Sequence, residues 1–332
     1  MRRPRRTTTG ILLAAGALTV TGVQATTAGA APAPAPAPAP ATAHTAPAAA
    51  QQQAAAFWTP ERMRTATPLD LPAATTSPGA LPAPASGSRP TTVAPTAPSA
   101  GVRSFPQAGG PWTGGGAVER TSGRVFFTFQ NRTASCSGNA VTSKNGSTVL
   151  TAGHCVKYQG SWHTNWVFVP GYRDGQAPHG KWSATTTMAT PEWVANEQTG
   201  MNFDVGAAVV GPLDGKRLTD AVGAQGLEFN GGYNKAMYSF GFPAASPYDG
   251  SKLIHCSGTA TKDFLLTKDH GLGCNMTGGS SGGPWFTSFD EATGTGLQAS
   301  VNSFGYTFLP NRMFGPYFGD EAKSLYERAQ TA

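Results

Sequence analysis

The chain has 332 residues and a formal net charge of +6. That charge is uneven: residues 1–30 hold four arginines and no acid, residues 31–115 hold four more arginines against two acids, and residues 116–332 carry no net charge. Because the folded part has no basic excess, the composition argues against a protein that binds nucleic acid by neutralising phosphates, and we expect no nucleic-acid partner.

The N-terminus has the pattern of an export signal. Four arginines within residues 2–6 precede the apolar run 11–18 and the small-residue site 28–30, as in a signal peptide. The apolar run is shorter than the roughly 20 residues that span a bilayer. We therefore expect residues 1–30 to be a signal peptide of a secreted, extracellular protein that has no membrane anchor. An uncleaved signal anchor is the alternative, and the export route stays open.

Residues 31–115 have the composition of a linker. They begin with Ala-Pro repeats, hold 17 of the chain's 27 prolines and contain few large apolar side chains. Such a stretch favours polyproline II and cannot offset its ordering entropy by burial. We expect a pro-segment or linker that is largely disordered. Its one aromatic patch, residues 57–63, is expected to be a solvated island, with a contact to the folded part as the alternative.

Residues 116–332 form the predicted folded domain. Short apolar or alternating runs are broken by Gly, Asn, Asp and Pro, at residues 124–129, 147–151, 166–170, 205–210, 237–241 and 297–301. Repeated short strands with turn signals between them predict an all-β sandwich or barrel. Near the end, acids at 320 and 321 precede apolar residues spaced by three and four, namely Ala322, Leu325, Tyr326 and Ala329. This spacing predicts one C-terminal helix packed on the barrel.

All four cysteines lie in this domain: Cys136, Cys155, Cys256 and Cys274. An even count in an exported chain predicts two disulfides. Three pairings are open, and the sequential one closes two short loops with one disulfide in each half. A zinc site is the competing interpretation, since His154 and His255 each adjoin a cysteine. Neither pair has the ligand spacing of a zinc cage, so we expect no metal.

Three segments contain candidate catalytic residues. His154 follows an apolar strand and adjoins a disulfide cysteine, which would hold it as rigidly as a general base requires. Ser281 lies in the run Gly-Gly-Ser-Ser-Gly-Gly-Pro of residues 278–284, whose glycines let the backbone turn tightly and direct two N–H groups into one space. Asp204 heads the apolar strand 205–210, where a partly buried acid needs a partner such as an imidazole N–H.

These motifs resemble those of a known family. Thr-Ala-Gly-His-Cys at 151–155 and Gly-Ser-Ser-Gly-Gly-Pro at 279–284, with the order His, Asp, Ser, are similar to the signatures of chymotrypsin/trypsin-like serine peptidases of the secreted bacterial type. The resemblance covers residues 117–332. It implies a chymotrypsin-like double antiparallel β-barrel with the active site between the barrels, a polypeptide substrate and no cofactor. We expect the protein to act as a monomer.

The resemblance also implies roles for individual residues. Ser281 would attack a peptide carbonyl, His154 would act as general base, and Asp204 would orient His154. The backbone N–H groups of Gly279 and Ser281 would form the oxyanion hole. The chain is thus expected to be a secreted serine endopeptidase that works through an acyl-enzyme. The alternatives are a catalytically silent homologue that serves as a secreted binding module, and an esterase with the same triad.

Two departures from the family pattern bear on activation and specificity. Ser280 stands where many animal members have an acid that pairs with a freed N-terminus, so activation by that ion pair is not expected. The expected substrate pocket consists of Asn275, Met276, Asn302, Ser303 and Phe304. It has neither the basal acid of a trypsin-like pocket nor the histidine of bacterial glutamyl endopeptidases, so it favours uncharged side chains.

Overall fold

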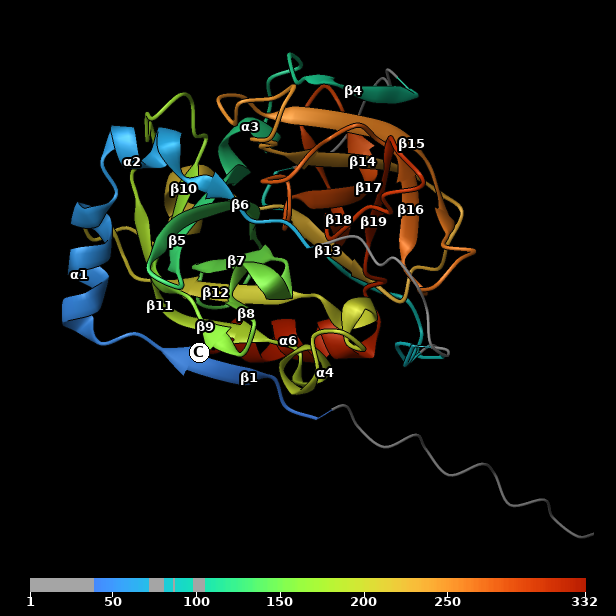
Figure 1. Cartoon of the computed structure of the whole chain (residues 1–332), viewed down its shortest axis with the longest axis horizontal. Coiled ribbons are helices and arrows are strands. Elements are labelled where there is room, and N and C mark those ends of the chain that lie inside the picture. Colours follow the sequence, from blue (N-terminus) through green and yellow to red (C-terminus); the bar gives the residue numbers. More distant parts are fainter. Residues whose placement is uncertain (1–38, 72–80, 86, 98–104) are drawn as a thin grey trace, which may run out of the picture. The chain divides into compact units, whose positions relative to one another are not determined.

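The computed structural model describes residues 39–71, 81–85, 87–97 and 105–332. The chain divides into two units, Met1–Ala37 and Pro38–Ala332, and the description below concerns the second (Figure 1). The predicted signal peptide at residues 1–30 lies outside the described residues. Within the described part, no helix combines the length and the apolar character needed to cross a membrane.

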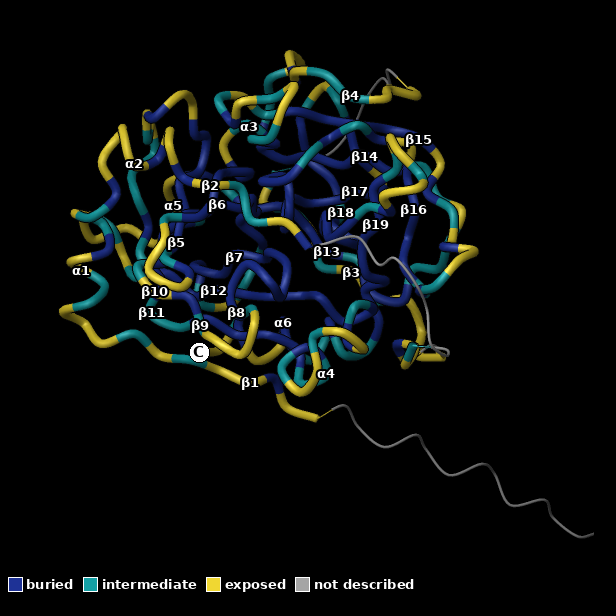
Figure 2. The backbone as a smooth tube through the Cα atoms, in the orientation of Figure 1, coloured by how far each residue is buried: buried dark blue, intermediate teal, exposed yellow. Residues whose placement is uncertain are grey.

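The first half of the domain is a closed barrel. Its strands are β5 (Ser122–Phe129), β6 (Arg132–Val141), β7 (Thr148–Thr151), β10 (Thr164–Pro170), β11 (Trp182–Ala189) and β12 (Gly206–Val210). They pair antiparallel in the order β11-β10-β5-β6-β7-β12, and pairing of β11 with β12 closes the ring. Large apolar side chains fill it, among them Val125, Phe127, Val149 and Phe168, none of which is exposed. Figure 2 shows these central strands as buried.

The second half is another sheet, followed by a helix. Its strands are β13 (Gly226–Phe229), β14 (Lys235–Gly241), β15 (Ile254–Lys262), β16 (His270–Gly273), β17 (Pro284–Asp290), β18 (Thr295–Val301) and β19 (Arg312–Gly315), in the order β19-β16-β15-β14-β17-β18-β13. Helix α6 (Asp320–Ala329) buries the predicted apolar stripe of Ala322, Leu325, Tyr326 and Ala329. The predicted all-β fold with a C-terminal helix is confirmed; a few short helices accompany the strands.

Each half of the domain contains one disulfide. Cys136 on β6 is bonded to Cys155, with Cα atoms 6.1 Å apart. Cys256 on β15 is bonded to Cys274, with Cα atoms 5.4 Å apart. This is the sequential pairing. The first bond ties β6 to the turn that carries His154, and the second ties β15 to the segment that leads to Ser281.

The described stretches of residues 31–115 form secondary structure on the surface of the domain. The elements are β1 (Thr42–Thr45), α1 (Ala48–Phe57), α2 (Pro60–Thr65), β2 (Thr67–Pro68), β3 (Thr91–Val93) and β4 (Gln107–Pro111). The four strands pair with β11, β6, β13 and β15 respectively. Strands pair at a sheet edge through backbone groups. An Ala/Pro-rich composition predicts disorder, but it does not exclude such pairing.

The aromatic patch at residues 57–63 is a contact and not a solvated island. The Trp58 side chain is fully buried. Its ring centroid lies 5.3 Å from that of Phe126 on β5, and its Nε1 donates a hydrogen bond of 2.6 Å to the Asn165 carbonyl on β10. Burial of an indole with its N–H satisfied is strongly favourable, and it fastens α1 and α2 to the barrel, as Figure 1 shows.

Candidate active site

His154 and Asp204 meet at the ends of two paired strands. His154 lies in a 3₁₀ turn, η1 (Gly153–Cys155), directly after β7, and Asp204 precedes β12. Because β7 and β12 pair antiparallel with Thr151 opposite Gly206, the residues just beyond these ends are neighbours. His154 Nδ1 lies 2.8 Å from Asp204 Oδ2, and both side chains are fully buried. The strand register therefore brings together two residues that are 50 positions apart.

The Asp204 carboxylate has two further hydrogen-bond donors. Its Oδ1 accepts a bond of 2.7 Å from the His154 backbone N–H, and its Oδ2 accepts one of 2.6 Å from Ser303 Oγ. A buried carboxylate needs such donors to compensate for the loss of water. Ser303 was expected to line the substrate pocket, and sequence reasoning missed that it also holds Asp204.

A second histidine supports the turn that carries His154. His163 Nε2 lies 2.8 Å from the His154 carbonyl oxygen, and the His163 ring stacks on Phe127 with centroids 4.2 Å apart. Burial lowers the pKa of His163 to about 3, so this ring is neutral at ordinary pH. It therefore holds the backbone of His154 in place without adding a second positive charge beside it.

The loop that carries Ser281 is held against the first barrel. The Ser281 carbonyl oxygen accepts a hydrogen bond of 2.7 Å from the Ser137 N–H on β6 and lies 3.6 Å from Cys155 Sγ. Ser137 Oγ also donates to the Gly279 carbonyl at 2.9 Å. These bonds bring the loop from the second sheet next to the disulfide beside His154.

Among the described residues, the reactive groups of this site have no hydrogen-bond partners. Within the described part of the chain, neither Ser281 Oγ nor His154 Nε2 has a hydrogen-bond partner. The backbone N–H groups of Gly279 and Ser281 likewise donate to none of the described residues. Hydrogen bonds between catalytic residues are often long or poorly aligned in the absence of substrate. Two free N–H groups in one loop can bind the carbonyl oxygen of a substrate.

Gly282 is the residue in this loop that depends most clearly on having no side chain. Its φ is +80°, and a Cβ there would overlap Thr151 Oγ1 and lie 2.5 Å from the Ser137 carbonyl oxygen. We expect Gly282→Ala to reduce the free energy of unfolding by about 2–4 kcal/mol and to displace Ser281.

Urea unfolding together with peptidase activity measures both effects. The matched control is Gly215→Ala, because Gly215 has a φ of +75° but nothing within 4 Å of its Cβ position. This control retains only the backbone strain, about 1 kcal/mol. Equal losses in the two variants would contradict the close packing inferred for Gly282.

A cavity of about 450 Å³ opens beside Ser281. Three of the expected pocket residues line it, namely Met276, Ser303 and Phe304. Sequence reasoning missed several others, because they come from parts of the chain far from the motifs: Tyr306, Arg312 and Met313 from the second half, and Asp70 and Leu71 from the N-terminal segment.

Two residues expected in the pocket lie elsewhere. Asn275 Oδ1 accepts a hydrogen bond of 2.6 Å from the Tyr248 hydroxyl. Asn302 is fully buried, and its Nδ2 donates a bond of 3.0 Å to the Ser280 carbonyl. Neither side chain lines the cavity. Asn302 instead helps to hold the loop that carries Ser281.

One cluster of possible metal ligands falls at this site. Ligand atoms of Cys136, His154 and Cys155 lie within 4.8 Å of one another, and they are the one such group found in the described residues. The two sulfurs form a disulfide, however, whereas metal binding requires thiolates. This cluster is therefore not a metal site.

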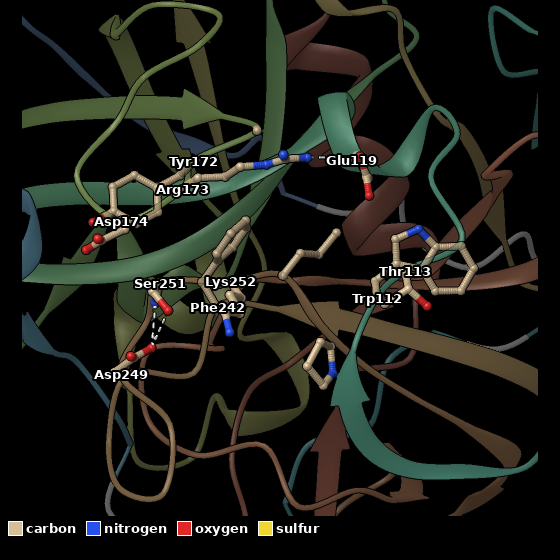
Figure 3. A pocket seen from close by; sticks show the side chains of 13 residues that line it. Trp112, Thr113, Glu119, Tyr172, Arg173, Asp174, Phe242, Asp249, Ser251 and Lys252 are labelled. Carbon is tan, nitrogen blue, oxygen red and sulfur yellow. Dashed lines mark hydrogen bonds and ion pairs between the residues drawn. The ribbon is translucent and has the colours of Figure 1, made fainter.

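A larger cavity, about 700 Å³, lies away from these residues (Figure 3). Trp112, Tyr172 and Phe242 contribute aromatic surface to it, and charges of both signs lie around its rim. Arg173 on that rim pairs with Glu119 at 3.1 Å. None of the candidate catalytic residues lines this cavity, so its size alone does not make it the reaction site.

The chain is similar to several solved protein structures. It is 44% identical to the protease Anisep from Arthrobacter nicotinovorans, with a TM-score of 0.60 over 64% of this chain and 96% of that one. It is 41% identical to the thermostable serine protease AL20 from an extremophilic microorganism, with a TM-score of 0.61 over 65% of this chain and 99% of that one. A Glu endopeptidase at 16% identity, with a TM-score of 0.53 over 69% of this chain and 99% of that one, shares the fold. No protein-family model matches the sequence, and no curated protein does so either.

Proposed function

Because the chain belongs to the chymotrypsin/trypsin-like serine protease family, we propose that it is a secreted endopeptidase in which Ser281, His154 and Asp204 form the catalytic triad. The observation that carries this proposal is the buried pair of His154 and Asp204 at 2.8 Å, next to a loop whose serine hydroxyl has no hydrogen-bond partner among the residues that the structure describes. The silent-homologue alternative is not favoured, since all three residues are present and the similar chains are proteases.

The geometry supports acyl transfer by general-base catalysis. Ser281 Oγ attacks the substrate carbonyl while His154 Nε2 takes up the hydroxyl proton, which it then donates to the leaving amine. Water then attacks the acyl-enzyme in the same way, with His154 again taking up the proton, and the carboxylic acid product is released. Asp204 holds the proton of His154 on Nδ1, so that Nε2 faces the serine as an acceptor.

The oxyanion would be stabilised by the backbone of the same loop. The N–H groups of Gly279 and Ser281 are free to donate to the developing negative charge, a contribution of about 3–4 kcal/mol per donor. The Gly278 carbonyl accepts a backbone hydrogen bond of 2.7 Å, and the Ser280 carbonyl accepts one of 3.0 Å from Asn302 Nδ2. These bonds fix the two peptides that carry the donors before the substrate arrives.

The substrate is a polypeptide whose side chain beside the cleaved bond is uncharged. Met276, Phe304 and Met313 give the cavity apolar walls, and the polar Asn275 side chain is bonded to Tyr248 instead. Arg312 also lines the cavity, but its Nη2 donates a hydrogen bond of 2.8 Å to Thr261 Oγ1. Export is supported by the N-terminal sequence pattern and by two disulfides, which persist in oxidising compartments.

Hydrolysis of a denatured protein substrate tests the proposal. We expect the disulfide-bonded protein, once its N-terminal segment is displaced, to cleave unfolded casein, and Ser281→Ala to abolish cleavage while keeping the same unfolding midpoint. Cleavage that survives in Ser281→Ala would contradict the assignment of the nucleophile. Complete absence of cleavage by every form of the wild-type chain would favour the silent homologue.

A further inference from the structure

Residues 67–71, here called the strap, lie along the cleft that contains Ser281. Thr67 and Pro68 form β2, which pairs in parallel with β6 opposite Ala134 and Ser135. The Leu69 N–H then donates a hydrogen bond of 2.9 Å to the Ser135 carbonyl. Figure 2 shows β2 next to β6. The strap therefore pairs with the backbone of the two residues that precede Cys136, the disulfide partner of Cys155.

The strap ends at the substrate cavity. Asp70 and Leu71 line that cavity together with Ser281 and Gly278. Asp70 Oδ2 lies 3.1 Å from where a Cβ on Gly278 would be, so it sits directly over the loop that carries the nucleophile. Leu71 is only 8% exposed and belongs to the same apolar cluster as Phe304.

The Asp70 carboxyl lies beside Gly278 in the cavity that Ser281 lines. Although Asp70 is an exposed residue, the loss of water around its carboxyl raises the pKa of Asp70, and attraction to His154 opposes that rise. A side chain in this position stands where the reacting part of a substrate must come.

The segments that flank the strap are anchored. Before it, Trp58 is buried against β5 and β10. After it, the Pro82 carbonyl accepts a hydrogen bond of 2.6 Å from Asn202 Nδ2, two residues from Asp204, and the Ala85 N–H donates to Glu321 Oε1 at 3.0 Å. Anchors on both sides raise the effective concentration of the strap at the cleft.

The direction of the strap is opposite to that of a substrate. The leaving amine must lie on the side of His154, which donates its proton, and the disulfide from Cys155 to Cys136 places Ser135 on that side. The acyl part lies at the cavity, so a substrate runs from the cavity toward Ser135. The strap instead runs from Ser135 toward the cavity, and it therefore presents no peptide bond in the orientation that the loop of Ser281 can cleave.

We propose that the strap is a built-in inhibitor that binds the cleft in reverse, so that the protease stays latent and the strap stays uncut until the N-terminal segment is displaced. This inference rests on the proposed function of Ser281. It assigns to residues 67–71 a regulatory role in which Leu69 supplies the backbone anchor and Leu71 the apolar one.

Labelling of the full chain with a fluorophosphonate tests the proposal, because the rate of labelling reports access to Ser281. Leu71→Ser removes the apolar anchor, and Leu69→Pro is a second variant that removes the N–H bonded to Ser135. We expect either variant to label at least about tenfold faster than the unsubstituted chain, since only the strap-released fraction reacts. Leu265→Ser, at a leucine that is 39% exposed, is the matched control and should label at the unsubstituted rate.

Hydrogen exchange in the same chains with Ser281→Ala shows independently whether the strap has been released and the rest remains folded. Faster exchange in residues 67–71 with faster labelling supports the inhibitor. Equally fast labelling in all chains would overturn it and leave the proposed function standing. No labelling in any chain, although exchange shows the strap released, would overturn the proposed function and the inhibitory role with it.

Discussion

Replacement of His154 by alanine is expected to lower kcat for a peptide substrate by about 10⁵–10⁶-fold, because the triad works as a unit and Ser281 would lose its general base. The residual activity would come from the free N–H groups of Gly279 and Ser281 and from binding. Activity measured with and without added imidazole checks the role, since a small base that enters the vacated space should restore part of the rate.

The control for this variant is His179→Ala. His179 lies away from the reaction site, on the turn before β11, and its loss should leave kcat unchanged. A His154→Ala enzyme that keeps more than about one hundredth of the wild-type kcat would contradict the assignment of the general base.

Asp204→Asn is expected to lower kcat by about 10⁴-fold with little change in fold. Asparagine has nearly the same shape, but an amide N–H facing His154 Nδ1 would force the imidazole proton onto Nε2, where the base is needed as an acceptor. The His154 N–H, which donates to Oδ1, would keep its acceptor, whereas the Ser303 hydroxyl, which donates to Oδ2, would instead accept from the new amide N–H.

Steady-state kinetics and unfolding midpoints together test the Asp204 prediction. Asp214→Asn is the matched control, because Asp214 is an exposed turn residue and its substitution should change neither quantity. A loss of kcat below about tenfold in Asp204→Asn, with an intact fold, would show that His154 does not depend on Asp204 for its tautomer.

The fold was predictable because its strands alternate or run apolar between clear turns. Helix α6 was predictable from the spacing of Ala322, Leu325, Tyr326 and Ala329, all of which are buried. The contact of His154 with Asp204 was not predictable from spacing, because it depends on the register that sets Thr151 opposite Gly206. Only the resemblance of the motifs to a known family suggested that these two residues meet.

The substrate cavity was predicted in part. Met276 lies near the Ser281 motif in the sequence and Phe304 is next to Ser303, so both could be predicted. Arg312 and Met313 lie on β19, and nothing in the sequence around them indicates that they line the cavity. Asn275 was predicted to line the pocket because it lies six residues before Ser281 in the sequence. Its side chain instead accepts a hydrogen bond from Tyr248 and does not line the cavity. Local sequence does not encode such a choice of partner.

The N-terminal segment was the least predictable part. Its pairings with β11, β6, β13 and β15 use backbone groups, which leave no pattern of side chains to detect. The aromatic patch at residues 57–63 was wrongly expected to be solvated, although its tryptophan, Trp58, has a large area to bury. Its contact with Phe126 could be found only once the barrel was in place.

The role of Ser281 is tested most directly by mapping the site at which a fluorophosphonate modifies the disulfide-bonded protein, in the chain with and without Leu71→Ser. We expect a single adduct on Ser281 that disappears in Ser281→Ala. An adduct on another residue, or no adduct even after the strap is released, would show that Ser281 is not an activated nucleophile.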